Sequence, residues 1–513
     1  MVDFSRRDFI KQSSKGLAFM SIPFVFRNDL DKALDAKGLM KSDPSGYFGH
    51  FGVDPSMVNK VMSAALSKGG DFCDVYFQHT IENYVILEDK QVNRAYTDVA
   101  LGAGIRVVKG DQTGYSFTED ISPESMIAAA KTAAAIANDS KEIPPIEFKY
   151  HKTPNYYPIQ KKWQDVKIDQ KIPFLEEIND KVFKQDSRIK KVTMYFIDGE
   201  SSVLVATSEG RYCTDYRPMT LLGVNCIAEQ NGKREDNGYN LSAREGIGFY
   251  TPERIDMLAT ESVSRTVNLF DAVKPEAGEM PVVLAAGSSG ILLHEAIGHG
   301  MEADFNRKKV SIYADKINKP IANEIVNIVD DGTNQNIRGS LNVDDEGNDT
   351  QKTFLVENGI LRTYLHDRIS AKHYNLKPTG NGRRESFRHS PMPRMRNTYM
   401  LPGPHKKEEI ISRVKKGLYA ETFTNGEVYI GGGDFTFYVK TGYLIEDGKL
   451  TKPVKDINII GNGPEVLENV EMVADDFKMA EGGWTCGKDG QGVPVSMGLP
   501  TVLVSSITVG GVS

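Results

Sequence analysis

The chain has 513 residues, of which 26% are charged and 40% hydrophobic, and its net charge is −7. This length is too great for one ordinary hydrophobic core and predicts about two to four domains. The acidic balance argues against a nucleic-acid partner, because phosphate binding requires a concentrated basic surface. No apolar run reaches about 18 residues, so we expect no membrane span within the chain.

The N-terminus has the features of an export signal. Two adjacent arginines in SRRDFIK precede the apolar run GLAFMSIPFVF, which is too short, and too interrupted by Pro23, for a stable spanning helix. SRRDFIK resembles the twin-arginine consensus, in which two arginines are followed by a variable residue, an aromatic and an aliphatic. We therefore predict a twin-arginine signal over residues 1–26, which implies transport of a folded chain to the periplasm. The protein would be membrane-tethered if the signal is retained, and the alternative is a basic N-terminus without a transport role.

The rest of the chain is predicted to have an α+β fold in three parts. Residues 27–49 are polar and indicate a linker. Residues 50–142 combine helical periods with alternating strands and predict an N-terminal α+β domain. A Pro-rich connection opens a middle α+β domain over residues 143–275. From residue 276 to residue 513, one helix near 289–300 precedes mainly short strands and Gly-containing turns, which indicates a β-rich C-terminal domain.

The C-terminal part contains the spacing H-E-x-x-x-H, formed by His294, Glu295 and His299 in HEAIGHGMEADF. In the more familiar zinc-protease motif the histidines are four residues apart, about 40° from each other around a helix. Five residues apart they would be separated by about 140°, so the helix must depart from regular α geometry. Gly298 and Gly300 flank the second histidine and tolerate the backbone of a bulge or helix end. The alternative is two helix histidines that only make hydrogen bonds in the core.

Cysteine usage suggests a third metal ligand. Catalytic zinc normally has three protein ligands and one open position for water. Cys486 lies in EGGWTCGKDGQG, whose glycines let a loop approach a metal closely. Cys213 and Cys226 are predicted to be buried free thiols, with a disulfide across a hairpin as the alternative.

Four segments together resemble the TldD/PmbA family of metalloproteases. They are HEAIGHGMEADFNRK, GNGRRESFRHSPMPRMRNTYM, VKDINIIGNGPEVLENVEMVADDF and GGWTCGKDGQGVPVSMGLPTVLV. The resemblance runs from about residue 50 to the end and implies a PmbA/TldD-like fold with a β-rich catalytic domain. It also implies that His294, His299 and Cys486 bind zinc and that Glu295 is the general base. All four residues are present, so the chain resembles the catalytic TldD-type subunit, although the familiar members lack an export signal.

These residues predict a zinc-dependent peptidase. Zinc lowers the pKa of a bound water toward about 7 and polarises the scissile carbonyl, while Glu295 transfers the water's proton to the leaving amine. The resemblance implies a homodimer, or a heterodimer with a PmbA-type subunit, that binds unfolded or extended peptides by strand addition. One alternative is a non-catalytic peptide-binding or scaffold subunit with a structural metal, and another is a hydrolase of small amides. A fourth protein ligand would favour the structural metal.

Three other polar groups have weaker functional interpretations. NVDDEGND, Asn342 to Asp349, does not have glycine where an EF-hand loop needs it, so a hairpin turn is predicted. GNGRRESFRHS supplies Arg383, Arg384, Arg388 and His389. These residues either line the cleft or form structural salt bridges, and His366 and His389 are weak candidates for transition-state stabilisation.

Overall fold

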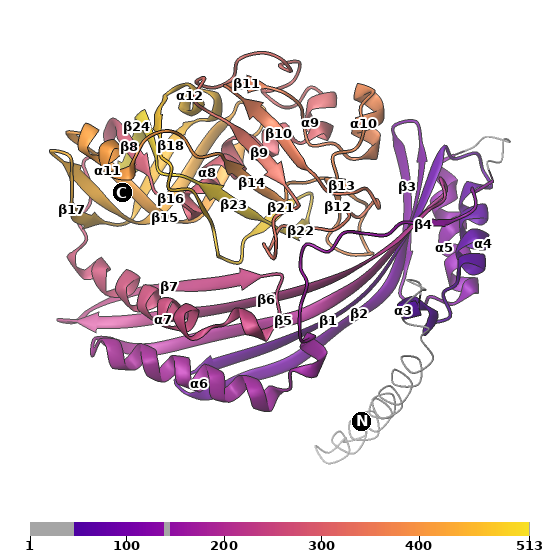
Figure 1. Ribbon diagram of the computed structural model, residues 1–513, viewed down its shortest axis with the longest axis horizontal. Coiled ribbons are helices and arrows are strands. Elements are labelled where there is room, and N and C mark those ends of the chain that lie inside the picture. The colour runs from indigo at the N-terminus through magenta and orange to yellow at the C-terminus, as the bar shows by residue number, and fades with distance from the viewer. Residues whose placement is uncertain (1–45, 138–143, 512–513) are drawn as a thin grey trace, which may run out of the picture. The chain divides into compact units, whose positions relative to one another are not determined.

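The computed structural model describes residues 46–137 and 144–511, and the predicted export signal lies outside them. The chain forms two units, Met1–Val58 and Asn59–Ser513. In the first unit, the last residues of the predicted linker form a short helix, α3 (Gly46–Gly49). The second unit contains the sheets and every residue of the predicted metal site (Figure 1).

A long, mainly antiparallel sheet of seven strands is formed by the N-terminal half of the second unit. Its order is β3-β2-β1-β5-β6-β4, and β7 also pairs with β6. The strands are β1 (Phe72–Glu88), β2 (Gln91–Lys109), β3 (Gln112–Thr118), β4 (Lys149–Tyr150), β5 (Ile189–Thr207), β6 (Arg211–Gln230) and β7 (Lys233–Ala243). Asp89 and Lys90 between β1 and β2, and Asn231 and Gly232 between β6 and β7, all have positive φ. Tight type I′ hairpin turns require this conformation.

The pairing of β1 with β5 joins the segments predicted as the first and second domains into one sheet. The two strands are antiparallel, from Asp74 opposite Thr207 to Glu88 opposite Thr193. The alternating pattern of each strand is visible in the sequence, but nothing in it tells which strand edges meet. The division between residues 142 and 143 therefore stays a prediction about sequence segments.

Helices cover the apolar surfaces of this sheet. They are α5 (Pro123–Ala133), α6 (Ile168–Gln185) and α7 (Pro252–Val267). A further helix, α4 (Pro55–Leu66), begins in the first unit and ends in the second. α6 and α7 lie side by side on one face (Figure 1) and share a buried core with β5, β6 and β7. The start of α7 is set by Thr251, whose side chain accepts a hydrogen bond from the backbone N–H of Arg254, and by Pro252 in the first turn.

Five strands of the C-terminal part close into a ring. Pairing runs β15-β8-β24-β18-β16 and returns from β16 to β15. The ring strands are β8 (Gly278–Leu284), β15 (Lys416–Tyr429), β16 (Asp434–Glu446), β18 (Ile457–Asn462) and β24 (Val502–Gly511), flanked by β17 (Lys449–Val454) and β19 (Val470–Val473). Phe435, Phe437 and many aliphatic side chains of this ring are buried in one large core. Closure leaves the ring without a free edge.

A six-stranded sheet packs beside the ring in the order β11-β10-β9-β14-β23-β20. Its strands are β9 (Ile328–Asp331), β10 (Lys352–Glu357), β11 (Ile360–Leu361), β14 (Asn397–Met400), β20 (Lys478–Met479) and β23 (Ser496–Leu499). Two small hairpins pair β12 (Gly382–Arg383) with β13 (Met392–Pro393) and β21 (Thr485–Lys488) with β22 (Gln491–Pro494). The short helices here are α8 (Ile291–Leu293), α9 (Ala303–Arg307), α10 (Arg368–Tyr374), α11 (Lys407–Arg413) and α12 (Gly463–Glu468).

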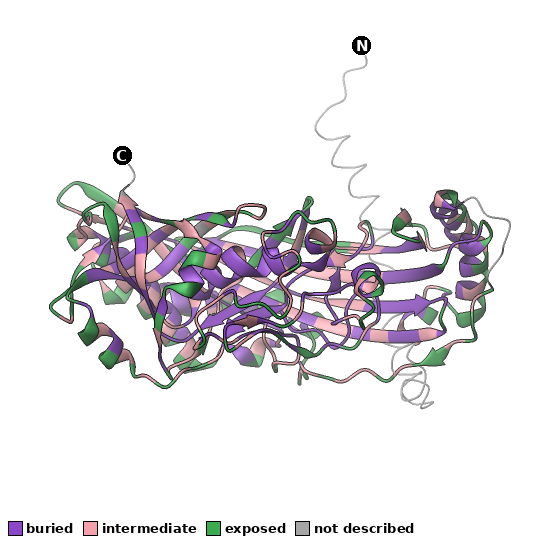
Figure 2. Ribbon diagram, turned by 90° about the horizontal axis from the view of Figure 1, so that it is seen from above, coloured by how far each residue is buried: buried purple, intermediate pink, exposed green. Residues whose placement is uncertain are grey.

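The predicted α+β class, with a β-rich C-terminal part, is confirmed. Figure 2 shows that buried residues run along the strands, whereas exposed residues lie mainly on loops and outer helix faces. Among the described residues, no helix has the length and apolar character needed to cross a membrane.

Candidate metal centre

The motif helix departs from α geometry at the two histidines, as the spacing predicts. A 3₁₀ turn over Ser288–Gly290 leads into α8, which is followed by a π-helical turn over His294–Gly298 and a second 3₁₀ turn over His299–Met301. The backbone N–H of His299 donates to the carbonyl oxygen of His294. This five-residue hydrogen bond widens the turn, so residues five apart lie on the same side of the helix.

Gly298 lies in the π-helical bulge and Gly300 at the end of the motif helix, as expected, but their backbone angles do not require glycine. Gly298 has right-handed helical dihedral angles, with φ −56° and ψ −49°, and Gly300 lies in a 3₁₀ turn without a positive φ. Close packing explains them instead. A Cβ on Gly298 would overlap Met395 Sδ, and a Cβ on Gly300 would lie 2.6 Å from Tyr313 Cδ2. The glycines therefore let neighbouring side chains pack against the motif helix.

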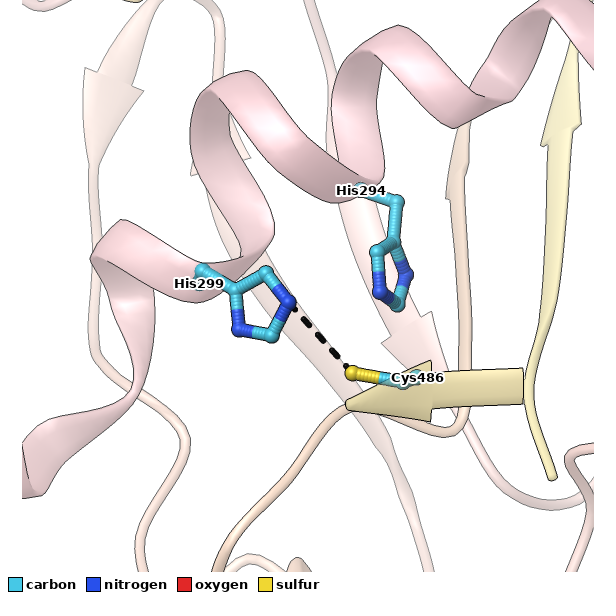
Figure 3. Close-up of side chains that lie close together, drawn as sticks. All are labelled: His294, His299 and Cys486. Atoms are coloured by element: carbon cyan, nitrogen blue, oxygen red, sulfur yellow. Dashed lines mark hydrogen bonds between the residues drawn. The ribbon is translucent and has the colours of Figure 1, made fainter. Parts of the chain in front are cut away.

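The three predicted metal ligands come together. One ligand atom each from His294, His299 and Cys486 lies within 4.8 Å of the others, and all three residues are buried. Cys486 Sγ is 3.4 Å from His299 Nε2, and the two imidazole rings are 5.1 Å apart and nearly perpendicular (Figure 3). Cys486 reaches the helix from β21, whose tight turn to β22 contains Asp489 and Gly490 with positive φ.

The electrostatics of the site favour the thiolate that a metal needs. Burial opposes ionisation of the Cys486 thiol, but His294 and His299 lower its pKa well below the usual value. Burial also opposes the charged form of His299, whereas Glu302 and Cys486 raise its pKa well above the usual value. Nδ1 of His294 is buried without a hydrogen-bond partner among the described residues. Two imidazoles and one thiolate are a donor set that suits zinc, so these residues fit the metal.

A buried carboxylate that the sequence interpretation did not assign supports His299. Glu302 Oε2 is 3.0 Å from His299 Nδ1 and 3.1 Å from Lys488 Nζ, and its side chain is fully buried. Burial disfavours this charge, but Lys488 and His299 lower the pKa of Glu302 to about 2. The contact leaves Nε2 of His299 facing Cys486, as in the carboxylate–histidine–zinc arrangement. In the sequence, the one indication of this contact is that Glu302 follows His299 by three residues, a spacing that places both on one side of a helical turn.

An arginine holds the cysteine hairpin in place. Arg394 is fully buried and donates to the carbonyl oxygens of Cys486, at 2.5 Å, and Gln491, at 3.2 Å. Its Nε lies 3.9 Å from Glu302 Oε1. One guanidinium thus connects the β21–β22 hairpin to the carboxylate behind His299. This role is absent from the sequence interpretation, because Arg394 is distant from both motifs along the chain.

Glu295 lies at the rim of the group. Its Oε2 is 3.9 Å from His299 Nε2, which is too long for a hydrogen bond, and 19% of its side chain is exposed. The carboxylate is therefore near the metal ligands but forms no hydrogen bond with His299. This position leaves it free to contact a water molecule or a substrate.

The other polar residues weighed in the sequence lie outside the metal group. Arg383 donates to the carbonyl oxygens of Met395 and Pro494, and Arg384 pairs with Asp74. Arg388 pairs with Glu119, and His389 contacts Ser386. His366 is buried beside Thr363, and burial lowers its pKa to about 4. The arginines thus make protein contacts, and none of these residues belongs to the group of potential metal ligands.

Two further predictions are tested by the structure. NVDDEGND forms the predicted turn, in which the Asp344 backbone N–H donates to Asn348 and Gly347 has a positive φ. Cys213 and Cys226 are buried free thiols, and both lie on β6. They cannot face each other across a hairpin, so the disulfide alternative is wrong.

A cavity of about 850 Å³ lies between two strands that end their sheets. One wall is formed by β7, at an edge of the seven-stranded sheet, and another by β20 and the residues after it. The metal ligands do not line it, but Trp484, two residues before Cys486, does. Ser288, at the start of the motif helix, also lines the cavity. Residues that line the cavity therefore lie close in the chain to Cys486 and to the helix that carries His294 and His299.

Comparison with known proteins identifies a family over most of the described residues. Residues 73–137, 161–270 and 277–511 match the first, central and C-terminal domains, respectively, of the PmbA/TldA metallopeptidases.

Relatives and solved structures extend this match. The chain is 38% identical to the metalloprotease TldD homolog of Haemophilus influenzae over 449 residues, covering 86% of this chain and 93% of the relative. It is 30% identical to the zinc metalloprotease TldD homolog of Saccharolobus solfataricus, covering 88% and 99%. The crystal structure of TldE from Thermococcus kodakarensis has the same fold, with a TM-score of 0.69, 17% identity and coverage of 88% and 100%. The chain therefore belongs to the PmbA/TldD family of metallopeptidases.

Proposed function

We propose that this protein is a catalytic, TldD-type zinc peptidase that hydrolyses unfolded or extended peptides. The observation that carries the proposal is the convergence of His294, His299 and Cys486 within 4.8 Å, with the Glu295 carboxylate beside them. Relatives named metalloproteases, one of them a zinc metalloprotease, support the same activity.

Each residue of the site has a distinct task in this proposal. Zinc bound by the two histidines and the cysteine would supply a Lewis acid and an activated water. Glu295 accepts a proton at Oε2 and returns it to the leaving amine. Glu302 fixes the ring orientation of His299 through Nδ1. Arg394 holds the Cys486 carbonyl, so the thiolate keeps its position during turnover.

The surroundings of the cavity support an extended peptide as the substrate. An extended peptide can add to an open sheet edge through main-chain hydrogen bonds, which requires no particular side-chain sequence. Both β7 and β20 are edge strands, and both line the cavity. An unfolded chain offers unpaired backbone along its whole length, whereas most strands of a folded protein are already paired, so unfolded chains are the expected substrates.

The alternative is a non-catalytic peptide-binding or scaffold subunit with a structural metal. Structural zinc sites are closed by four protein ligands. In the described part of the chain, the metal group contains three ligand residues, which favours the catalytic function. A hydrolase of small amides would use the same residues, and a panel of peptides and small amides distinguishes the two activities.

Export in the folded state is part of the proposal. The SRRDFIK segment supports a twin-arginine route to the periplasm, with the protein tethered to the membrane if the signal is retained. Zinc bound before export would protect Cys486 from oxidation. Fractionation of cells that express Arg6→Lys with Arg7→Lys tests this route, and periplasmic recovery of that variant would contradict it.

The function is tested by removing the proposed general base alone. We expect Glu295→Gln to reduce hydrolysis of unfolded peptides by about 10²- to 10⁴-fold, because general-base catalysis contributes that much. Zinc content should stay at the parent level, since Glu295 is not a proposed ligand. Undiminished hydrolysis by this variant, or no hydrolysis by the zinc-loaded parent, would contradict the proposal.

A further inference from the structure

One continuous stretch of the cavity wall leads along the chain to the cysteine ligand. Residues 478–484 all line the cavity of about 850 Å³, and the last of them, Trp484, precedes Cys486 by two residues. Residues 285–288 also line the cavity, and they end at the turn that leads into the motif helix. Both stretches therefore end close in the chain to the metal ligands. A peptide that extends from the cavity to the metal would pass Trp484.

Strand geometry places the Trp484 side chain on the same face of the β21–β22 hairpin as the Cys486 thiol. The backbone N–H of Val495 donates to the Trp484 carbonyl oxygen at 3.1 Å, which extends the pairing of the hairpin by one residue. Along β21 the residues alternate between exposed and buried, and Cys486 is on the buried face. Residues two apart in a strand share a face and are separated by about 7 Å. Trp484 therefore lies on the metal side of the strand, about 7 Å from Cys486.

The backbone of Trp484 is held firmly, but its indole N–H is not engaged. Arg338 is buried and donates from Nε to the Trp484 carbonyl oxygen and from Nη1 to Ser242 Oγ of β7, both at 2.9 Å. The indole packs against Gly482, where a Cβ would lie 3.1 Å from Trp484 Nε1. This Nε1 has no hydrogen-bond partner among the described residues, whereas Nε1 of Trp163 donates to a backbone carbonyl oxygen. Trp484 thus brings an apolar ring and an unused donor to the cavity wall.

We propose that Trp484 forms a subsite that receives a large apolar or aromatic side chain of the substrate, two residues from the peptide bond that is cleaved. An extended peptide also advances about 7 Å in two residues, so a scissile carbonyl at the metal places that side chain beside the indole. The ring buries the side chain, and Nε1 donates to a peptide carbonyl oxygen. The inference rests on the proposed peptidase function. It adds a preference at one position to main-chain binding, which accepts any sequence.

Peptide hydrolysis tests the subsite in the zinc-loaded full-length protein. The probes are unfolded, Ala- and Ser-rich peptides with a single Phe, and matched peptides with Ala in its place. The parent should cleave two residues from the Phe, with a kcat/KM at least about tenfold higher for the Phe peptide, because an apolar subsite discriminates by that much. Trp484→Ala should bring this ratio close to one, whereas Trp484→Phe should keep most of it. Tyr429→Ala removes an exposed aromatic side chain outside the cavity and should keep the parent ratio.

Intrinsic fluorescence tests the contact without cleavage. The chain has two tryptophans, and Trp163 is buried in a different core, so a change of emission on peptide binding reports on Trp484. In the Glu295→Gln background, the Phe peptide should change the emission at a concentration at least about tenfold lower than the Ala peptide. Adding Trp484→Phe to this background should abolish the change.

The outcomes separate this subsite from the peptidase function. Hydrolysis with equal Phe preference in the parent and in Trp484→Ala, or a preference for a charged side chain at that position, would overturn the subsite alone. An emission that does not respond to the Phe peptide would also overturn it. No hydrolysis of any peptide by the zinc-loaded parent would overturn the peptidase function together with the subsite that rests on it.

Discussion

Glu302 and Lys488 show how much of the metal site depends on residues behind the ligands. Neither is a proposed ligand, yet Glu302 contacts His299 and Lys488 compensates the buried charge of Glu302. A histidine ligand whose second nitrogen is held by a carboxylate is both oriented and more basic. The affinity of the site for zinc should therefore depend on Glu302.

Glu302→Gln tests this dependence. We expect zinc affinity to fall about 10- to 100-fold, the usual cost of losing such a partner. Asp304→Asn is the matched control, because Asp304 also pairs with Lys488 but has no contact with His299. Competition with a chromophoric chelator measures both affinities. Equal affinities in the two variants would show that the Glu302 contact does not support the site.

At the residue scale, the sequence predicted the three metal ligands, but it did not predict the buried residues that hold those ligands in place. His294, His299 and Cys486 could be proposed because their side chains have metal chemistry and, for the two histidines, an informative spacing. Arg394 and Lys488 resemble ordinary surface cations in a sequence, and only the fold makes them buried partners of Glu302. Buried charges of this kind are paired in space between segments that are far apart in the chain.

At the scale of the element, the π turn connects the sequence pattern to the site. The five-residue spacing predicted that the helix must deviate, and the hydrogen bond from His299 to His294 is that deviation. The role of Gly298 could not be predicted, because Met395, which packs against it, lies almost a hundred residues further along the chain. Close packing between distant segments has no local sequence signal.

Gly298→Ala measures the packing on the motif helix. The added methyl group overlaps Met395 Sδ, so we expect the free energy of unfolding to fall by about 1–3 kcal/mol. Met395→Ala in the same chain should relieve part of this overlap. Gly487→Ala is a suitable control, because a Cβ there meets nothing within 4 Å. Equal denaturant midpoints for Gly298→Ala and Gly487→Ala would contradict the packing explanation.

At the scale of the whole second unit, the Asn342 to Asp349 turn of the C-terminal part forms buried ion pairs with the long sheet. Asp345 pairs with Arg217 of β6, Glu346 pairs with Arg106 of β2, and all four side chains are almost fully buried. The sequence predicted the turn itself, but charged residues are expected at a surface. Their burial follows from the packing of the turn against the sheet, which the local pattern does not contain.

This turn should make stability depend on pH. Burial raises the pKa of Glu346 from 4.5 to about 7, although Arg106 works in the opposite direction. A raised folded-state pKa means that the native chain binds a proton that the unfolded chain has lost. The free energy of unfolding should therefore fall as pH rises from about 4.5 to 7. Glu346→Gln should flatten this dependence in denaturant titrations, and an unchanged slope would contradict it.

The most direct measurement is the zinc content per chain of the purified full-length protein and of its Cys486→Ser variant. We expect about one zinc ion per chain in the parent, the number that one three-ligand site holds, and much less in the variant. That result would establish the His294, His299 and Cys486 site on which the proposed catalysis rests. Zinc retained by the variant would remove Cys486 from the ligand set. A parent without bound metal would contradict the metallopeptidase function and favour a binding subunit.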